Sequence, residues 1–174
     1  DLNQTIKQIA NASDKVDVIL TCGGVSVGEE DHIKAAVETL GSINLWKIKI
    51  KPGKPFAFGY IGKTAFMGMP GNPVSAWVTF ALLCRPYIIK RAGGNVPGNS
   101  TIFLESNFEW SKPNDRQEFL RGKINEDGKL EIFKNQNSQI LSSVCFSEGL
   151  IEIPTKTSVS KGDKLRYYPF SMIL

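Results

Sequence analysis

The stretch DVILTCGGVSVG, residues 17–28, decides the fold of this chain. The almost wholly apolar run at residues 16–21 is typical of a parallel strand buried on both faces. Two adjoining glycines, Gly23 and Gly24, follow the run at once and predict a tight turn. A helix is then expected from about residue 31 to residue 40, because Gly41 is a stop signal. A strand, a glycine turn and a helix in this order indicate an α/β sheet.

Two further loops are also punctuated by glycine and proline. They read KPGKP at residues 51–55 and GMPGNPVS at residues 68–75, and no acidic residue occurs between residues 39 and 104. Glycines let backbone N–H groups approach a ligand, and prolines fix the shape of a loop. The three loops together therefore predict a site that holds an anion.

The remaining elements of the first half follow from spacing. We expect a helix near residues 2–10, strands at 45–51, 56–60 and 64–69, and a long helix at 73–91. The strand at 45–51 alternates cleanly, so Lys47, Lys49 and Lys51 are expected on one of its faces. Asn72 is a natural N-cap for the long helix, and Pro86 is expected to kink it near its end.

The character of the chain changes after the patternless stretch GGNVPGNS at residues 93–100. Short alternating segments separated by turn signals then predict a small β-barrel or sandwich. We therefore expect two domains, residues 1–94 and 95–174. The strands are expected at residues 102–108, 118–124, 129–133, 150–153 and 164–168.

The net charge of +4 over 174 residues is unevenly placed. Residues 1–94 hold eleven Lys and Arg against seven Asp and Glu, whereas residues 95–174 hold ten of each. The excess positive charge thus belongs to the part with the three loops. Nucleic-acid binders usually show a basic stripe with aromatic residues available for stacking, and here the lysines cluster at loops. A small phosphorylated or oxyanionic ligand is favoured over nucleic acid.

The cysteine spacing and the hydropathy of the chain limit the cellular compartments that are expected. The three cysteines have no C-x-x-C spacing, which disfavours a disulfide framework and a zinc site and fits a reducing cytoplasm. There is no run of eighteen apolar residues and no signal peptide, so neither membrane insertion nor secretion is predicted. The chain lacks an initiator Met, and we expect it to be a fragment of a longer protein.

Some charged residues of the loops are candidates for chemistry. Lys51 and Lys54 are held between prolines in a fixed frame, which favours a role in binding, whereas Lys49 alone is explained by a solvated sheet edge. Asp31 either supports a helix N-terminus or holds a Mg²⁺ ion that bridges phosphate oxygens. The only histidine, His32, is more simply structural or exposed.

Three motifs resemble the signature of the molybdopterin molybdenumtransferase family, which includes the E domain of gephyrin. They are GGVSVGEED at residues 23–31, WKIKIKPGKP at 46–55 and MGMPGNPVSA at 67–76. The resemblance continues through residues 115–122 and 137–154 and covers almost the whole chain. It implies a three-layer α/β molybdopterin-binding domain, truncated at its N-terminus, followed by a small all-β barrel domain.

The resemblance also implies an activity and its partners. Such an enzyme inserts molybdate into adenylated molybdopterin with the help of Mg²⁺ and releases AMP. The implied partners are a small-molecule substrate, a second copy of the full-length protein in a homodimer, and other enzymes of molybdenum cofactor synthesis. The fragment alone is expected to be inactive. The alternative is a non-catalytic, gephyrin-like scaffold on the same fold, and a nucleic-acid-binding module is a third hypothesis.

The matching motifs also imply which residues of this chain form the site. The turn that aligns with the family's G-S-H reads Asn137-Ser138-Gln139 here, which leaves Ser138 and Ser142 as alternatives for one hydroxyl. The resemblance assigns catalysis to Asp31, Lys47, Lys51 and Lys54, with Asp31 also at the metal. It assigns binding to Gly23, Gly24, Ser26, Gly28, Pro55, Pro70, Gly71, Asn72, Ser75, Arg121 and Ser138.

Overall fold

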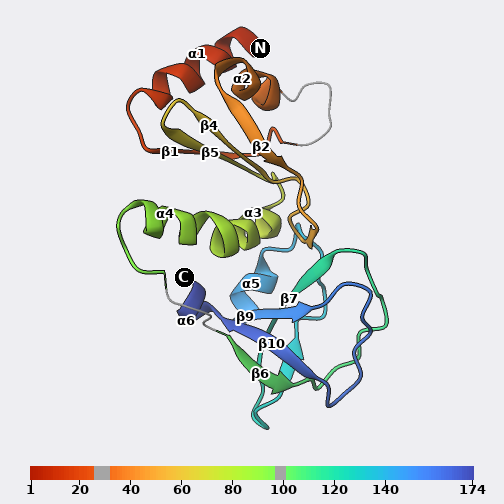
Figure 1. Ribbon diagram of the computed structural model, residues 1–174. Coiled ribbons are helices and arrows are strands. Elements are labelled where there is room, and N and C mark those ends of the chain that lie inside the picture. The colour runs from red at the N-terminus through yellow and green to blue at the C-terminus, as the bar shows by residue number, and fades with distance from the viewer. Residues whose placement is uncertain (26–31, 97–100) are drawn as a thin grey trace. The chain divides into compact units, whose positions relative to one another are not determined.

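The computed structural model describes residues 1–25, 32–96 and 101–174. The chain divides into two compact units, each with its own sheet (Figure 1). Unit 1 comprises residues 1–48 and 53–80, and unit 2 comprises residues 49–52 and 81–174. The domain limits expected at residues 94 and 95 stay a prediction.

The sheet of unit 1 has four strands in the order β1, β5, β4, β2. They span Val18–Cys22, Thr64–Met69, Ala57–Ile61 and Ser42–Trp46. β1 pairs with β5 in parallel, which confirms the parallel strand expected near residues 16–21, and β4 is antiparallel to β5 and β2. The expected burial of β1 on both faces is wrong, because Leu20 is 39% exposed on the face opposite Ile19.

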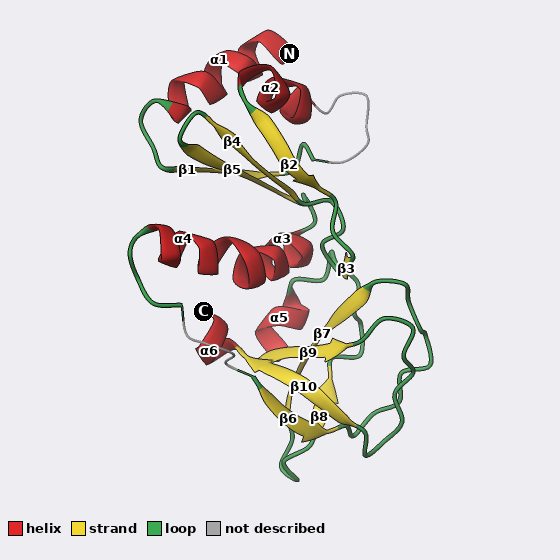
Figure 2. Cartoon of the chain, in the orientation of Figure 1, coloured by secondary structure: helices red, strands yellow, loops and turns green. Residues whose placement is uncertain are grey.

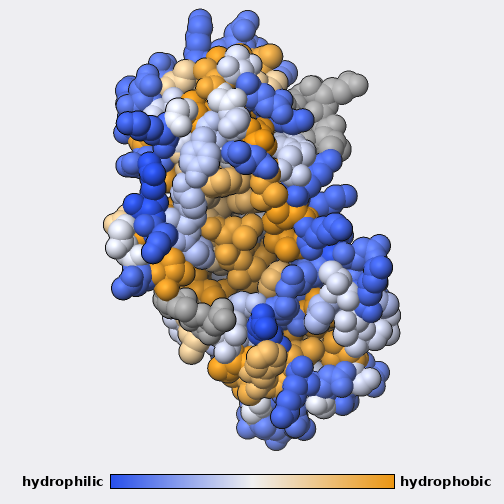
Figure 3. Space-filling model, in the orientation of Figure 1, coloured by the Kyte–Doolittle hydropathy of each residue, from blue (hydrophilic) through white to orange (hydrophobic). Residues whose placement is uncertain are grey.

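Helices cover both faces of this sheet. α1, Leu2–Ser13, and α2, His32–Leu40, lie on one face, and α3, Pro73–Thr79, lies on the other (Figure 2). The predicted three-layer arrangement is thereby confirmed. Hydrophilic side chains cover most of the visible side of α1 (Figure 3). The core under α1 and α2 contains Ile9, Val25, Ala36, Val37, Ala57, Ile61 and Phe66.

The prediction of one continuous strand at residues 45–51 is wrong. β2 ends at Trp46, and Lys47 has a φ of 69°, a left-handed backbone that breaks the alternation. Residues Ile50–Lys51 form a separate strand, β3, in the sheet of unit 2. The three lysines of this stretch therefore do not share one strand face. The turn expected at Gly62 between β4 and β5 is confirmed by its φ of 57°.

The long helix expected at residues 73–91 is confirmed as a helical run with an irregular centre. α3 is followed by a π-helical turn at Phe80–Cys84 and by α4, Arg85–Arg91. Pro86 has no N–H, and its ring crowds the carbonyl four residues earlier. This accounts for the change from α-helical to π-helical hydrogen bonding just before it. Asn72 occupies the N-cap position of α3, as expected, although its side chain makes no capping hydrogen bond there. In the described ranges, no helix combines the length and apolar character that a membrane span needs.

Unit 2 is built on a six-stranded sheet in the order β3, β7, β9, β10, β6, with β8 paired to β7. The five strands expected from alternation are confirmed within a few residues at their ends. The strand pairing does not close the sheet fully into a barrel; the segment after β6 meets β8 at a single bridge between Ser106 and Leu130, beside which the N–H of Asn107 donates to the carbonyl of Leu130 at 2.8 Å. Two short helices, α5 at Ser142–Phe146 and α6 at Phe170–Ile173, had no sequence signal. The strands are β6 Ile102–Glu105, β7 Gln117–Ile124, β8 Leu130–Ile132, β9 Gly149–Ile153 and β10 Lys164–Pro169.

Candidate functional site

Two of the glycine loops meet at the carboxyl edge of the unit 1 sheet. Gly23 follows β1, and its N–H donates to the carbonyl of Met69 at the end of β5 at 2.9 Å. A Cβ added to Gly71 would lie 3.6 Å from the Cα of Gly23, so the two backbones are in van der Waals contact. Gly23 and Gly24 have φ values of 89° and 68°, which favour glycine. Ligands of open α/β sheets bind at this edge.

Val25 anchors the first loop to the sheet. Its side chain is 2% exposed and lies directly over Gly68 of β5. A Cβ at Gly68 would stand 2.3 Å from the Cγ1 of Val25, so only a hydrogen leaves room there. The thiol of Cys22 also donates to the carbonyl of Pro70 at 3.4 Å. These contacts fix the start of the first loop against the second.

The third loop begins and ends at the same edge. Trp46 at the end of β2 and Gly68 near the end of β5 both pair with Ala57 at the start of β4. Lys47 follows this edge, and its N–H donates to the carbonyl of Phe56 at 2.9 Å. The N–H of Ile48 donates to the carbonyl of Lys54 at 3.0 Å. The exposed side chains of Lys47 and Lys54 thus belong to the edge that carries both glycine loops.

The other assigned residues of unit 1 differ in exposure. Gly24, Gly71 and Asn72 are exposed, whereas Pro70 is buried and Pro55 is half-buried. Ser75, in α3, is only 4% exposed. Ser26, Gly28 and Asp31 lie outside the described residues, so their predicted roles stay predictions. No group of three His, Cys, Asp or Glu that could hold a metal occurs in residues 1–25, 32–96 and 101–174.

Lys51 lies in unit 2 beside a buried carboxylate. β3 pairs in parallel with β7, which places Lys51 next to Glu118, and the Lys51 ammonium contacts the Oε1 of Glu118. Glu118 is 2% exposed, and its Oε2 accepts a hydrogen bond from the Nε1 of Trp110 at 2.8 Å. The sequence has no carboxylate near Lys51, but the fold supplies one. The Lys51 charge is therefore largely neutralised within unit 2.

Arg121 of β7 is a buried cation with neutral partners. Its side chain is 1% exposed, and the described residues give it no carboxylate. Its Nε donates to the Oγ of Ser143 at 3.1 Å, and its two terminal nitrogens donate to the carbonyls of Phe119 and Asn137 at 3.4 Å each. Burial lowers the pKa of Arg121 to about 10, because desolvation disfavours the charged form. A guanidinium in this setting is well suited to an anionic ligand.

Ser143, which the sequence did not single out, supplies a hydroxyl that supports Arg121. Ser143 accepts from the guanidinium and donates to the carbonyl of Ile140 at 2.6 Å. Ser138 is half-buried, and Ser142 is exposed at the first position of α5. The hydroxyl-rich turn was the only sequence signal for Ser143, and it could not select one serine. The binding role assigned to Ser138 stays a prediction.

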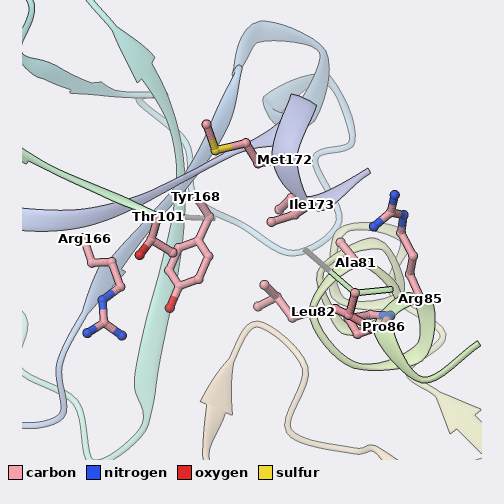
Figure 4. Close-up of a pocket in the computed structure, with 10 residues that line it drawn as sticks. Ala81, Leu82, Arg85, Pro86, Thr101, Arg166, Tyr168, Met172 and Ile173 are labelled. Carbon is pink, nitrogen blue, oxygen red and sulfur yellow. The ribbon is translucent and has the colours of Figure 1, made fainter. Parts of the chain in front are cut away.

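A small cavity of about 170 Å³ lies elsewhere in unit 2 (Figure 4). Apolar side chains of Leu82, Met172 and Ile173 surround it, with Arg85 and Arg166 at opposite ends. Arg166 is paired with Glu152 at 3.5 Å. None of the residues assigned from the motifs lines this cavity, so it is not the candidate site.

Comparison with known proteins matches both halves of the chain. Residues 1–90 match the family described as "Probable molybdopterin binding domain", and residues 104–170 match "MoeA C-terminal region (domain IV)". A molybdopterin molybdenumtransferase of Haemophilus influenzae is 40% identical over 97% of this chain and 43% of its own length. The molybdenum cofactor synthesis protein cinnamon of Drosophila melanogaster is 35% identical over 89% of this chain and 27% of its own length.

A solved structure agrees with these matches. The molybdopterin biosynthesis MoeA protein of Pyrococcus horikoshii superposes with a TM-score of 0.78 at 26% identity. The superposition covers 98% of this chain and 41% of that protein. The chain thus spans less than half the length of these relatives.

Proposed function

Since the chain belongs to the family of probable molybdopterin-binding domains, we propose that it serves a molybdopterin molybdenumtransferase of molybdenum cofactor synthesis. The proposed reaction inserts molybdate into adenylated molybdopterin and releases AMP. The observation that carries this proposal is the meeting of two glycine loops and the Lys47 and Lys54 segment at one edge of the unit 1 sheet. That edge offers backbone N–H groups and positive charge to an anionic pterin.

Each unit is proposed to supply part of the chemistry. In unit 1, the glycine loops and residues 70–75 bind the pterin and its phosphates, and Lys47, Lys54 and Pro55 face molybdate. In unit 2, Lys51, Arg121 and Ser138 contribute further groups. Molybdate is a hydrated dianion, and only fixed positive charge makes its approach to an anionic dithiolate tolerable. Replacing oxo groups by sulfur consumes protons, which lysine ammonium groups can supply.

Three finer features belong to the same proposal. Mg²⁺ is proposed at Asp31, where it would bridge phosphate oxygens of the substrate and assist hydrolysis of the phosphoanhydride. The full-length protein is proposed to be a homodimer that works with other enzymes of the pathway. A cytoplasmic location is proposed because the three cysteines are all free.

The proposal is tested by complementation with the full-length protein. Lys54→Ala and Asp31→Asn are each expected to lower molybdenum cofactor synthesis in a deficient cell by about 10²-fold or more, the usual cost of removing a preorganised charge. Lys7→Ala, on the exposed side of α1, is the matched control and should restore synthesis fully. Full activity in both site variants would remove the site assignment, and a scaffold function would predict that result.

A further inference from the structure

Glu118 of β7 is a buried carboxylate to which the motifs assign no role. It is 2% exposed, and an ionised carboxylate is kept at such a place only when partners replace the lost water. Its Oε2 accepts the hydrogen bond from the indole of Trp110 at 2.8 Å. In the described ranges, the ammonium of Lys51 is the one partner of Oε1. Glu118 therefore depends on Lys51 for its second oxygen.

Lys51 in turn depends on β7 at two points. Strand β3 consists of Ile50 and Lys51 alone, and its backbone pairs in parallel with Gln117 and Glu118. The N–H of Gln117 also donates to the carbonyl of Lys49 at 3.0 Å. The residue opposite Lys51 in the sheet thus also holds its ammonium. A lysine side chain has many rotamers, and the two attachments together restrict it to a narrow range of directions.

The ammonium that Glu118 holds can still reach a ligand. Lys51 and Trp110 line an open cavity of unit 2 with a volume of about 690 Å³. The Lys51 side chain is 40% exposed, whereas Glu118 is closed off from solvent. An ammonium carries three donors, and the contact with Glu118 leaves two of them for a ligand.

The ion pair changes what Lys51 can contribute to an anion site. Its charge is offset by Glu118, so Lys51 attracts distant anions less than Lys54 does, which is exposed and forms no ion pair among the described residues. What the pair supplies is direction. A donor that is already fixed loses little freedom when it meets an oxo group in the reacting geometry.

We propose that Glu118 is a positioning residue of the molybdate insertion reaction and acts through Lys51. It fixes the Lys51 ammonium as an oriented donor to an oxo group of the oxyanion substrate, and Trp110 fixes the carboxylate. The inference rests on the proposed function and adds to it a residue that touches no substrate. Direct contact between Glu118 and molybdate is disfavoured, because both are negatively charged.

Steady-state kinetics of the full-length protein, with molybdate varied, test the proposal. Glu118→Gln keeps the size of the side chain and an acceptor for Trp110, but it removes the charge that holds Lys51. We expect kcat to fall at least about tenfold, because the donor is no longer oriented. We expect KM for molybdate to fall at least about twofold, because a negative charge near the dianion is gone. Damage to the fold alone would lower kcat without lowering KM.

Two further variants separate charge from structure. Glu118→Asp keeps the charge, and the flexible stem of Lys51 can follow the shorter carboxylate, so kcat should stay within about threefold of the parent value. Glu105→Gln is the matched control, because Glu105 also pairs with a lysine of unit 2, Lys129, at 3.1 Å. It should leave kcat and KM unchanged. A fall in kcat without a fall in KM for Glu118→Gln, or equal losses in the Gln and Asp variants, would overturn the positioning role.

An acylating reagent followed by mass spectrometry gives a readout that needs no turnover. Glu118→Gln should raise the labelling rate of Lys51 at least about threefold, because the contact that competes with the reagent is lost. The labelling of Lys161, an exposed lysine of the same unit, should not change. Unchanged Lys51 labelling would overturn the proposal even in an active enzyme. If the parent protein inserts no molybdate, the proposed function fails and the positioning role fails with it, whatever the labelling shows.

Discussion

Replacing Arg121 by methionine should remove oxyanion binding with little loss of stability. Burial lowers the pKa of Arg121 to about 10 from 12.5, which corresponds to about 3 kcal/mol against the charged form. Its hydrogen bonds to Ser143, Phe119 and Asn137 oppose this cost, but two of them are 3.4 Å long. Together they contribute about 2–3 kcal/mol. Because the two quantities nearly cancel, Arg121→Met should change the free energy of unfolding by no more than about 1 kcal/mol.

The direction of the Arg121 pKa shift determines the pH at which unfolding should be measured. The folded-state pKa of Arg121 lies below its unfolded value, so the unfavourable contribution is complete below about pH 10 and fades only as the pH rises toward 12.5. Urea unfolding at neutral pH therefore measures it in full. Ile151→Ala is the reference, since Ile151 is fully buried and its truncation should cost about 2–5 kcal/mol. Molybdate binding is measured in parallel by calorimetry.

Two results would refute the reasoning on Arg121. A loss of more than about 3 kcal/mol in Arg121→Met would mean that the guanidinium is part of the fold, in the manner of a buried pair that has lost one partner. Undiminished molybdate binding would mean that the cation does not face the anion. Arg121→Lys separates charge from shape, because lysine keeps the charge and loses the planar fork.

Two further predictions concern packing and thiol chemistry. Gly68→Ala should lower the free energy of unfolding in urea by about 1–3 kcal/mol, because the added Cβ would overlap Val25. Adding Val25→Ala to the same chain should relieve the overlap. Losses that simply add in the double variant would contradict the steric account. Burial raises the pKa of the Cys84 thiol to about 12. At pH 8 a disulfide reagent should therefore label the exposed Cys22 and Cys145 quickly and label Cys84 only after unfolding. Equally fast labelling of all three thiols would contradict this prediction.

Much of the fold follows from patterns with a local cause. The run at residues 16–21 is followed at once by two glycines, and the carboxyl ends of neighbouring parallel strands share one edge, so the loops after β1 and β5 had to come close. Among the strands of unit 2, β10 alternates between exposed and buried residues at its start, whereas β7 is buried on both faces. The π-helical turn before Pro86 and the short helices α5 and α6 left no comparable pattern.

The failures have a different cause, since they depend on partners distant in sequence. Alternation continued smoothly through residues 45–51, and nothing in it marks Lys47 as a residue with positive φ. β3 has only two residues, and it exists because β7 offers a parallel edge more than sixty residues later. The strand QEFLRGKI has charged and apolar residues on both faces, so its pattern could not reveal that Glu118 and Arg121 are both buried.

The candidate residues thus carry positive charge in two physical forms. Lys47 and Lys54 are exposed, so their charge is hydrated and inexpensive to keep, and it acts at a distance by drawing anions toward the loops. Arg121 is desolvated, and the folded chain bears the cost of its charge even without a ligand. A desolvated cation with unused donors gains more from an anion than a hydrated one does, because little water must leave it on binding. An exposed lysine is therefore expected to attract an anion weakly and from a distance, whereas the buried arginine is expected to bind an anion more tightly and in a fixed orientation.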